Sequence, residues 1–181
     1  MTIRRATLDD IPIIRQLAEE IFPVTYRDII SREQSAFMME WMYGIDSLHR
    51  QIADEGHVYQ LAYDGDEAIG YVSVQREGDD VYHLQKIYVL PSRQGMGCGR
   101  QLFNAAIDYV KSVHPEPCSV RLNVNRQNNA VGFYKKMGMD IIAQGDFPIG
   151  NGFFMNDYIM AITLTAPAAS CRTRGLSSGR R

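Results

Sequence analysis

The sequence predicts an α/β fold, and two observations carry that prediction. Segments whose apolar residues recur every three or four positions, as on one helix face, alternate with segments rich in β-branched and aromatic residues. In the middle of the chain, a strand pattern over residues 83–90 runs through a glycine-rich turn into a helix pattern over residues 99–112. The elements follow the order β-α-α-β-β-β-α-β-α-β-β, in one domain that we place at residues 1–165.

The N-terminal half is expected to hold a strand, two longer helices and a hairpin. Thr7 is a candidate N-cap for the first helix, which should end near Pro23 because proline interrupts helical hydrogen bonding. Ser31 caps a second helix that ends at Gly44. The expected inward-facing residues of this helix are Phe37, Met38, Trp41 and Met42. The expected elements of this half are residues 3–6, 11–23, 31–43, 47–55, 57–63 and 68–75, with a hairpin turn at Asp64-Gly65.

The C-terminal half is expected to hold a strand, a short helix and a closing pair of strands. Residues 119–125 alternate apolar and polar side chains, which is typical of a half-buried strand. A helix over residues 127–136 presents Phe133 and Tyr134 to the interior. Residues 139–143 and 153–164 are the closing strands, on either side of the glycine-containing segment 145–152.

The central turn predicts a phosphate-binding site. Gly95, Gly97 and Gly99 lack a Cβ atom, so a ligand can approach their N–H groups closely, and the first turn of the following helix offers unpaired N–H groups and a partial positive charge. A P-loop would need a Gly-Lys-Ser/Thr ending, whereas Arg100 and Gln101 follow Gly99. A dinucleotide-binding loop would need its last glycine where Arg100 stands.

Two motifs resemble those of the GCN5-related N-acetyltransferase (GNAT) family. The family's Q-x-x-G-x-G loop is matched by residues 94–99, QGMGCG, which follow the segment KIYVLP. Its N-x-A-x-x-F-Y-x-x-x-G-F signature is resembled by residues 128–139, NNAVGFYKKMGM. The resemblance covers roughly residues 3–165. It implies a mixed, strongly twisted sheet with helices on both faces, in which the parallel strands flanking the central helix splay apart to form the active site.

The resemblance also implies acetyl-CoA as the co-substrate, with its pantetheine along the first splayed strand and its pyrophosphate on the glycine turn. Asn123, Asn125 and Asn128 are candidates to bind the pantetheine, and capping of turns is an equally good interpretation of these three residues. Cys98 lies in the turn but has no evident base beside it, which disfavours a nucleophilic role. The candidate cofactor-binding residues are Ile87, Tyr88, Val89, Gln94, Gly95, Met96, Gly97, Cys98, Gly99, Arg100, Asn123, Asn128 and Lys136.

Acetyl transfer to an amine needs a base, an oxyanion donor and an acid, because only about one molecule in 2,500 of a lysine-like amine is neutral at pH 7. The resemblance makes Tyr134 the acid that protonates the leaving thiolate; a core aromatic is the alternative. His83 stands where some family members carry a glutamate base, although an ordinary strand histidine is equally compatible. The N–H of Val89 is the candidate oxyanion donor. Glu33, Glu40 and Asp157 are further candidates for the base.

The acceptor is the least determined partner. Residues 9–55 carry ten acids against four arginines, which suits a small cationic, polyamine-like amine, but a solvated helical surface explains the same charges. Residues 150–160 resemble the last hairpin of a bacterial subgroup that includes polyamine acetyltransferases. A protein N-terminus or lysine is the second candidate, and a non-catalytic acyl-CoA sensor is a third.

Composition excludes several classes. Without its last 17 residues the chain holds 15 basic and 21 acidic residues, a poor match for nucleic acid. No apolar run is long enough to cross a bilayer, so we expect a soluble, cytoplasmic protein, with a homodimer as one option. The spacing of the three cysteines fits neither a metal site nor a disulfide framework. Residues 166–181 are rich in small residues and arginine and are expected to form a disordered basic tail, with weak partner or nucleic-acid binding as the alternative.

Overall fold

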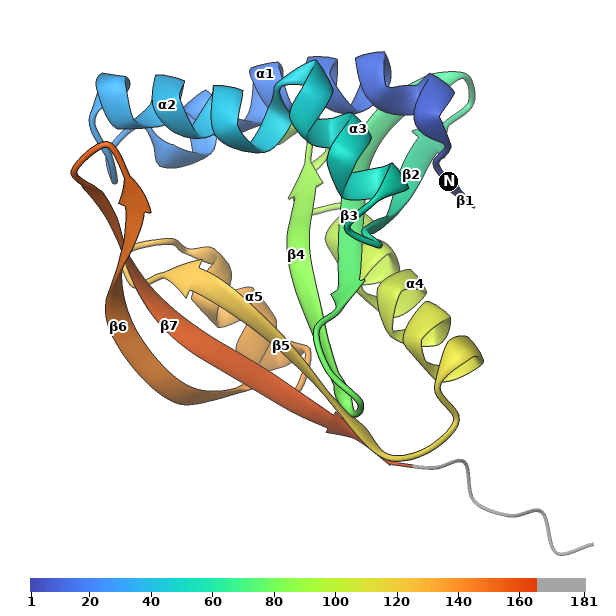
Figure 1. Cartoon of the computed structure of the whole chain (residues 1–181). Helices are drawn as coiled ribbons and strands as arrows, with labels where there is room; N and C mark the ends of the chain where they lie inside the picture. The colour runs from blue at the N-terminus through green and yellow to red at the C-terminus, as the bar shows by residue number, and fades with distance from the viewer. Residues whose placement is uncertain (166–181) are drawn as a thin grey trace, which may run out of the picture.

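A seven-stranded mixed sheet with helices on both faces forms residues 1–165, the part of the chain that the computed structural model describes (Figure 1). This confirms the α/β class and the mixed sheet; the tail expected at 166–181 lies outside the described residues. The strands lie in the order β1-β2-β3-β4-β5-β7-β6. The elements are β1 (Thr2–Arg5), α1 (Ile11–Tyr26), α2 (Arg32–Tyr43), α3 (Ile45–Ala53), β2 (Val58–Asp64), β3 (Glu67–Arg76), β4 (Val81–Val89), α4 (Cys98–Val113), β5 (Cys118–Asn125), α5 (Ala130–Lys136), β6 (Asp140–Gly150) and β7 (Phe153–Leu164).

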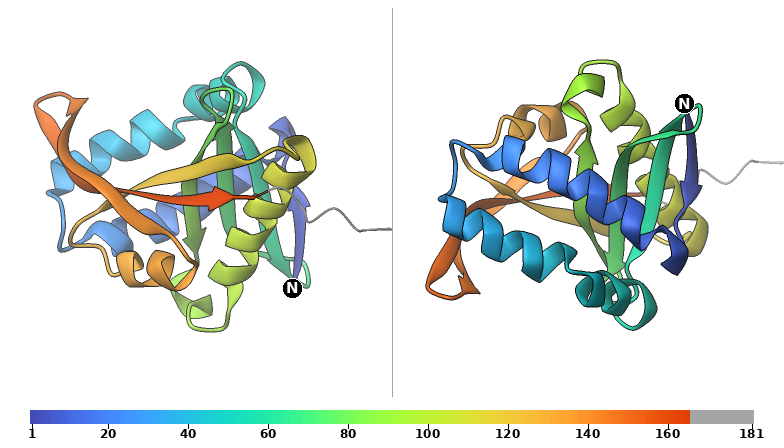
Figure 2. Two further views of the ribbon diagram at one scale, coloured as in Figure 1. Left: turned by 90° about the horizontal axis from the view of Figure 1, so that it is seen from below. Right: turned by 90° about the horizontal axis from the view of Figure 1, so that it is seen from above.

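The helices form two layers, one on each side of the sheet. Helices α1, α2 and α3 cover one face, and α4 and α5 cover the other (Figure 2). The face of α4 that the sequence spacing predicted is the buried one, with Leu102, Phe103 and Val110 at most 3 % exposed. Burying such a stripe against the sheet is the main force that holds an amphipathic helix in place. Within residues 1–165, no helix combines the length and apolarity needed to cross a membrane.

The sheet opens between β4 and β5, which run parallel. They pair only where they begin, at Val81 with Ser119, Tyr82 with Val120 and His83 with Arg121, and then diverge (Figure 1). Each strand keeps its other neighbour: β4 pairs with β3 up to Val89, and β5 pairs with β7 along its whole length. Both strands are therefore held in position while their carboxyl ends separate.

The boundaries of three helices differ from the sequence prediction. Helix α3 begins at Ile45 and ends at Ala53, two residues before the expected positions at both ends. Helix α1 does not end at Pro23 but continues to Tyr26. Proline removes only one helical hydrogen bond. The ring centres of Phe22 and Tyr26 are 4.4 Å apart, and the packing of these rings outweighs that loss near the helix end. Helix α5 begins at Ala130 rather than at residue 127, because the Oδ1 atom of Asn128 accepts a hydrogen bond from the Ala130 amide and holds the preceding residues in a turn.

The α2 and β6 predictions also need correction. Trp41 does not face inward but is 48 % exposed and stacks on the Phe37 ring. The β6 strand is longer than the expected 139–143: it runs to Gly150, pairing with β7 as far as Phe153. Its side chains are mostly exposed, so the apolar alternation that reveals a strand in a sequence is weak there.

Candidate functional site

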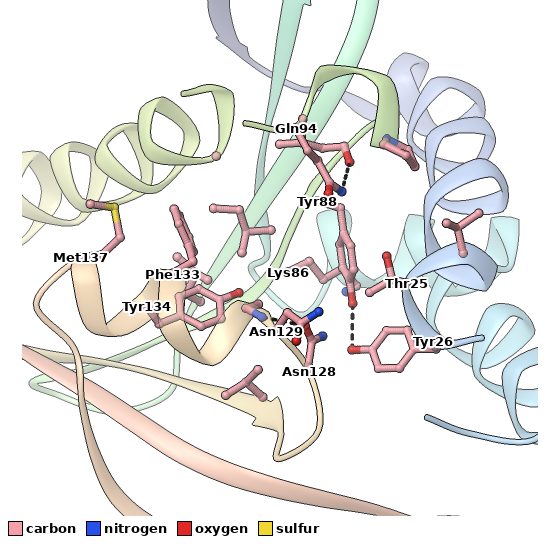
Figure 3. Close-up of a pocket in the computed structure, with 18 of the residues that line it drawn as sticks. Thr25, Tyr26, Lys86, Tyr88, Gln94, Asn128, Asn129, Phe133, Tyr134 and Met137 are labelled. Carbon is pink, nitrogen blue, oxygen red and sulfur yellow. Dashed lines mark hydrogen bonds between the residues drawn. The ribbon is translucent and has the colours of Figure 1, made fainter. Parts of the chain in front are cut away.

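A cavity of about 740 Å³ opens in the wedge between β4 and β5. One wall consists of the carboxyl end of β4, the glycine turn and the start of α4; we call it the cofactor wall. The facing wall is formed by the end of α1 and the residues after it, Val24 to Ile29, which we call the acceptor wall. Residues of β5 and α5, among them Asn123 and Tyr134, close the cavity between these walls (Figure 3).

The glycine turn has the geometry that a phosphate group requires. Gly95 and Gly97 have φ values of 78° and 85°, a left-handed conformation that side-chain-bearing residues rarely adopt. Gly97 is the residue that precedes the first turn of α4. Within residues 1–165, the backbone amides of residues 95–100 donate to no protein acceptor, and the first helical bond into this segment runs from the Gln101 amide to the Gly97 carbonyl, at 3.1 Å. These donors are therefore available to an anionic ligand.

Most of the predicted cofactor-binding residues line the cavity. Met96 and Cys98 do not: the Met96 side chain is 66 % exposed, and Cys98 is buried beneath the turn. Arg93 forms ion pairs with Asp64 and Glu67, which hold it on the β2–β3 hairpin. The predicted residues that do line the cavity are Ile87, Tyr88, Val89, Gln94, Gly95, Gly97, Gly99, Arg100, Asn123, Asn128 and Lys136.

Two side chains stabilise the backbone of the site. The Gln94 amide group donates to the Val89 carbonyl at 3.1 Å and so ties the start of the glycine turn to the end of β4 (Figure 3). Asn125 is 4 % exposed, and its Oδ1 atom accepts from the Gln127 amide at 2.9 Å. Asn125 and Asn128 thus both cap turns, as the alternative interpretation held, and Asn128 also faces the cavity.

Tyr134 extends from α5 into the cavity (Figure 3). Its side chain is almost fully buried, and burial raises the pKa of Tyr134, since the phenolate would lose its hydration. The hydroxyl group therefore stays protonated at neutral pH. A buried, protonated phenol in the lining of the cavity has the form that a general acid requires.

His83 lies outside the cavity lining, because it belongs to the last residue pair before β4 and β5 separate. Its Nδ1 atom is 3.0 Å from a Glu77 carboxylate oxygen. The same oxygen accepts from Gln85, which does line the cavity. The role of His83 as a base stays a prediction, and any such role would act through these two residues. Glu33 and Glu40 lie on α2, away from the lining residues.

The acceptor wall and its neighbourhood hold polar groups whose mutual contacts the sequence did not predict. The hydroxyl groups of Tyr26 and Tyr88 are 3.3 Å apart, and either can donate. Asp28 adds an exposed carboxylate to the lining. On β7, Asp157 is 6 % exposed and its Oδ1 atom has no partner within residues 1–165; burial raises the pKa of this carboxyl group to about 6. The aromatic residues near the first helix were visible in the sequence, but no spacing connected them to β4.

Lys86 is a further residue of the lining that the sequence did not assign to the site. The sequence presents it only as part of the segment before the glycine turn, where a lysine would ordinarily be a solvated surface group. In the structure it is 7 % exposed, on the stretch of β4 that has separated from β5.

Comparisons with known proteins agree with this geometry. A family model described as an acetyltransferase (GNAT) domain matches residues 25–147. The chain is 27 % identical over 108 residues to the peptidyl-lysine N-acetyltransferase YjaB of Escherichia coli K12, and 27 % identical over 103 residues to YjaB of Salmonella typhimurium LT2. These matches span 59 % and 56 % of this chain, and 65 % and 63 % of the relatives, so the chain covers slightly less than two thirds of each relative's length.

Solved structures show the same fold. The PaiA N-acetyltransferase of Thermoplasma acidophilum, solved in complex with coenzyme A, matches with a TM-score of 0.73 at 22 % identity, over 88 % of this chain and 96 % of that one. A GCN5-related N-acetyltransferase from Rhodopseudomonas palustris matches with a TM-score of 0.74 at 18 % identity, over 90 % and 95 % of the two chains. Since the family model covers more than half of the sequence, this chain belongs to the GNAT acetyltransferase family.

Proposed function

We propose that this protein transfers the acetyl group of acetyl-CoA to an aliphatic primary amine, by direct attack in a ternary complex. The observation that supports this best is the position of Tyr134. Its protonated phenol lies in the same cavity as the unpaired amides of residues 95–100, on the opposite side of the wedge from β4. Membership of the acetyltransferase family supports the interpretation of this arrangement as an acetyl-transfer site.

The residues of the cofactor wall fit coenzyme A. Its pyrophosphate would be held by the amides of residues 95–100, with Arg100 and Lys136 close enough in the lining to add positive charge. Its pantetheine arm would lie along β4, where the strand edge is left free by the departure of β5. The thioester is thereby directed into the wedge.

The chemistry then proceeds by addition and elimination. The acceptor nitrogen attacks the thioester carbon, and the oxyanion that forms can accept a hydrogen bond from the free edge of β4, for which the Val89 amide is the candidate. When the C–S bond breaks, Tyr134 donates its proton to the thiolate of coenzyme A. The amide nitrogen loses a proton and the phenol is restored.

A small cationic amine is the first candidate acceptor. The acceptor wall carries the carboxylate of Asp28. Burial raises the pKa of Tyr26, and the charge of the nearby Asp157 adds to this effect. Negative charge at this end of the cavity favours a cationic group. Polyamines carry further ammonium groups that could bind there.

A protein lysine is the second candidate acceptor, because aromatic side chains are exposed on α2 and on the β6–β7 hairpin. Trp41 and Phe154 are 48 % and 51 % exposed, and Phe37 contacts both Trp41 and Phe153. Exposed aromatic residues of this kind are common in surfaces that bind peptides. The YjaB relatives are named for acetylation of peptidyl lysine.

One assay tests both candidates. Acetyl-CoA is incubated with the protein and a panel of polyamines, amino acids and lysine-containing peptides, and the release of free thiol is followed. Turnover that is fastest with polyamines supports the first candidate, and turnover that is fastest with peptides supports the second. Coenzyme A binding without turnover on any amine would instead identify a non-catalytic acyl-CoA sensor.

A further inference from the structure

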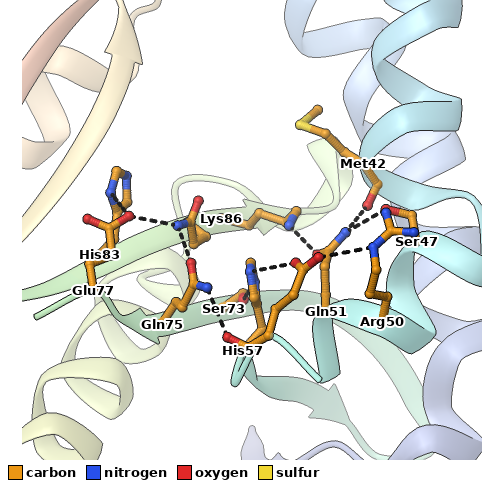
Figure 4. A network of polar contacts seen from close by, with 12 residues as sticks. Met42, Ser47, Arg50, Gln51, His57, Ser73, Gln75, Glu77, His83 and Lys86 are labelled. Atoms are coloured by element: carbon orange, nitrogen blue, oxygen red, sulfur yellow. Dashed lines mark hydrogen bonds and ion pairs between the residues drawn. The ribbon is translucent and has the colours of Figure 1, made fainter. Parts of the chain in front are cut away.

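Lys86 occupies a position that is unusual for a lysine. Its backbone belongs to the free stretch of β4, and its side chain runs under α3, where the Nζ atom donates to the Gln51 Oε1 atom at 2.7 Å (Figure 4). That oxygen also accepts from the Tyr59 hydroxyl at 2.7 Å. The Nζ atom lies 5.6 Å and 5.3 Å from the ring centres of Tyr43 and Tyr59.

These contacts do not balance a permanent positive charge. An ammonium group has three donors, and within residues 1–165 only Gln51 provides an acceptor at hydrogen-bond distance. The acid whose charge acts on Lys86 is Glu55, which forms its ion pairs with Arg50 and His57, at 3.0 Å and 3.7 Å. Burial therefore lowers the pKa of Lys86 to about 7, and a large fraction of this amine is neutral at physiological pH.

His57 and the tyrosines that surround Lys86 do not titrate near neutrality. Burial lowers the pKa of His57 to about 4, so this imidazole is neutral, and burial raises the pKa values of the surrounding tyrosines, which stay protonated. The titratable and charged groups around Lys86 are Tyr43 of α2, Arg50 and Glu55 at the end of α3, His57 and Tyr59 of β2, Tyr71 of β3, and His83 and Tyr88 of β4.

We propose that Lys86 is the general base that removes a proton from the acceptor ammonium group before attack. This rests on the proposed function, since it needs an amine in the cavity that Lys86 lines. The neutral Nζ atom takes one proton from the ammonium group; the freed amine forms the C–N bond, and the C–S bond breaks. Tyr134 protonates the thiolate and receives the second nitrogen-bound proton, and Lys86 releases the first proton to solvent.

Two features support this assignment over the alternatives. Lys86 is one of the residues that line the cavity, so an acceptor amine bound beside it would also lose hydration, and a lower pKa of that amine would make proton transfer between the two nitrogen atoms more nearly balanced. Asp157 is the competing base, but it is not part of the cavity lining, whereas Lys86 is. His83 reaches the lining only through Glu77 and Gln85.

The test compares two acceptors in the full-length protein. Butylamine is almost entirely cationic at pH 7, whereas trifluoroethylamine is mostly neutral and needs no base before attack. We expect Lys86→Met to lower kcat/KM for butylamine by about a hundredfold, the usual contribution of a general base, but to affect trifluoroethylamine by only a few-fold. Lys111→Met, on the exposed surface of α4, is the matched control and should change neither value. Lys86→Arg, a permanent cation, should fail as Lys86→Met does.

The outcomes separate the two proposals. Equal losses on both amines would show that Lys86 only supports the structure, and a butylamine-selective loss in Asp157→Asn but not in Lys86→Met would assign the base to Asp157; either result overturns the proposal. Wild-type protein that acetylates neither these amines nor the acceptor panel would overturn the proposed function, and this inference with it.

A second measurement needs no variant and applies even if Lys86→Met does not fold. If Lys86 is the base, wild-type kcat/KM for butylamine rises through pH 7 and is level above about pH 8, because the enzyme then takes up the ammonium form directly. If free amine is required instead, kcat/KM keeps rising tenfold per pH unit toward the pKa of the amine, near 10, which would contradict the proposal.

Discussion

The two walls of the cavity offer different kinds of polar group to a ligand. The cofactor wall offers backbone amides, made available by glycines with positive φ and by the start of α4. The acceptor wall and its surroundings offer side chains, namely Tyr26, Asp28 and the buried amine of Lys86, from segments that are about sixty residues apart in the sequence. The backbone amides come from one short segment of the chain. The side chains come from distant segments that only the folded structure brings together.

This difference has a consequence for substitutions. A change in the glycine turn alters the path of the backbone and should affect every cofactor contact at once. A change on the acceptor wall removes one contact and should affect one step or one class of acceptor. The predictions below test this contrast, in order of decreasing expected effect.

Gly97→Val should have the largest effect. A β-branched residue at a φ of 85° is strained by roughly 1–2 kcal/mol or more, and relief of that strain moves the amides that would bind the pyrophosphate. We expect coenzyme A affinity, measured by calorimetry, to fall about a hundredfold in a protein that still folds. Gly65→Val is the matched control: Gly65 also has a positive φ, 60°, and open space around it, but it lies in the β2–β3 turn, so it should lower stability without changing affinity.

Tyr134→Phe should slow catalysis without weakening cofactor binding. Removing the proton donor for the thiolate should lower kcat at least about tenfold, while the aromatic ring still fills the cavity and coenzyme A affinity stays within about twofold. Tyr82→Phe is the control, since Tyr82 is also a buried tyrosine but lies outside this cavity. Unchanged turnover in Tyr134→Phe would remove this residue from the mechanism.

Asp28→Asn should affect only acceptors that carry further ammonium groups beside the reacting amine. An exposed ion pair contributes roughly 0.2–1 kcal/mol, so the KM for a polyamine should rise about two- to fivefold and the KM for butylamine should hardly change. Glu20→Gln, an exposed acid of α1 outside the cavity, provides the control. Equal effects on both amines would argue against a further ammonium group of the polyamine bound at this wall.

Asp10→Asn should leave kinetics unchanged and alter stability instead. Arg4 contacts the Asp10 carboxylate with two nitrogen atoms, at 2.7 Å and 2.8 Å, and lowers the pKa of Asp10 from 3.8 to about 2. Because the folded-state pKa is the lower one, the stabilisation is present above about pH 4 and is lost as the pH falls toward 2. With Arg4 half exposed, we expect a loss of about 1–2 kcal/mol in urea unfolding at pH 7 and little difference from wild type at pH 2.

The backbone geometry of the cofactor wall was predictable from the sequence because its determinants are local. The spacing of Gly95, Gly97 and Gly99 between a strand and a helix pattern is enough to place free amides at a helix start, whatever the rest of the chain does. Element order and the inward face of α4 were predictable for the same reason, since each follows from the periodicity of one segment.

The remainder depended on tertiary packing. Helix α1 continues past Pro23 because Phe22 and Tyr26 are buried, and His83 misses the cavity because the strands have not yet separated at its position. Lys86 looks like a surface lysine until α3 and β2 cover it. Such outcomes depend on residues distant in the sequence, and no local pattern encodes them.

The most direct test of the central claim is a titration of the isotopically labelled protein with coenzyme A, followed by the amide signals of residues 95–100 in ¹⁵N-resolved NMR spectra. If these amides bind the pyrophosphate, they should be among the most strongly shifted, and pantetheine, which lacks the pyrophosphate, should leave them unchanged while shifting signals along β4. Coenzyme A binding that leaves these six amides unmoved, or the absence of any binding, would contradict the account.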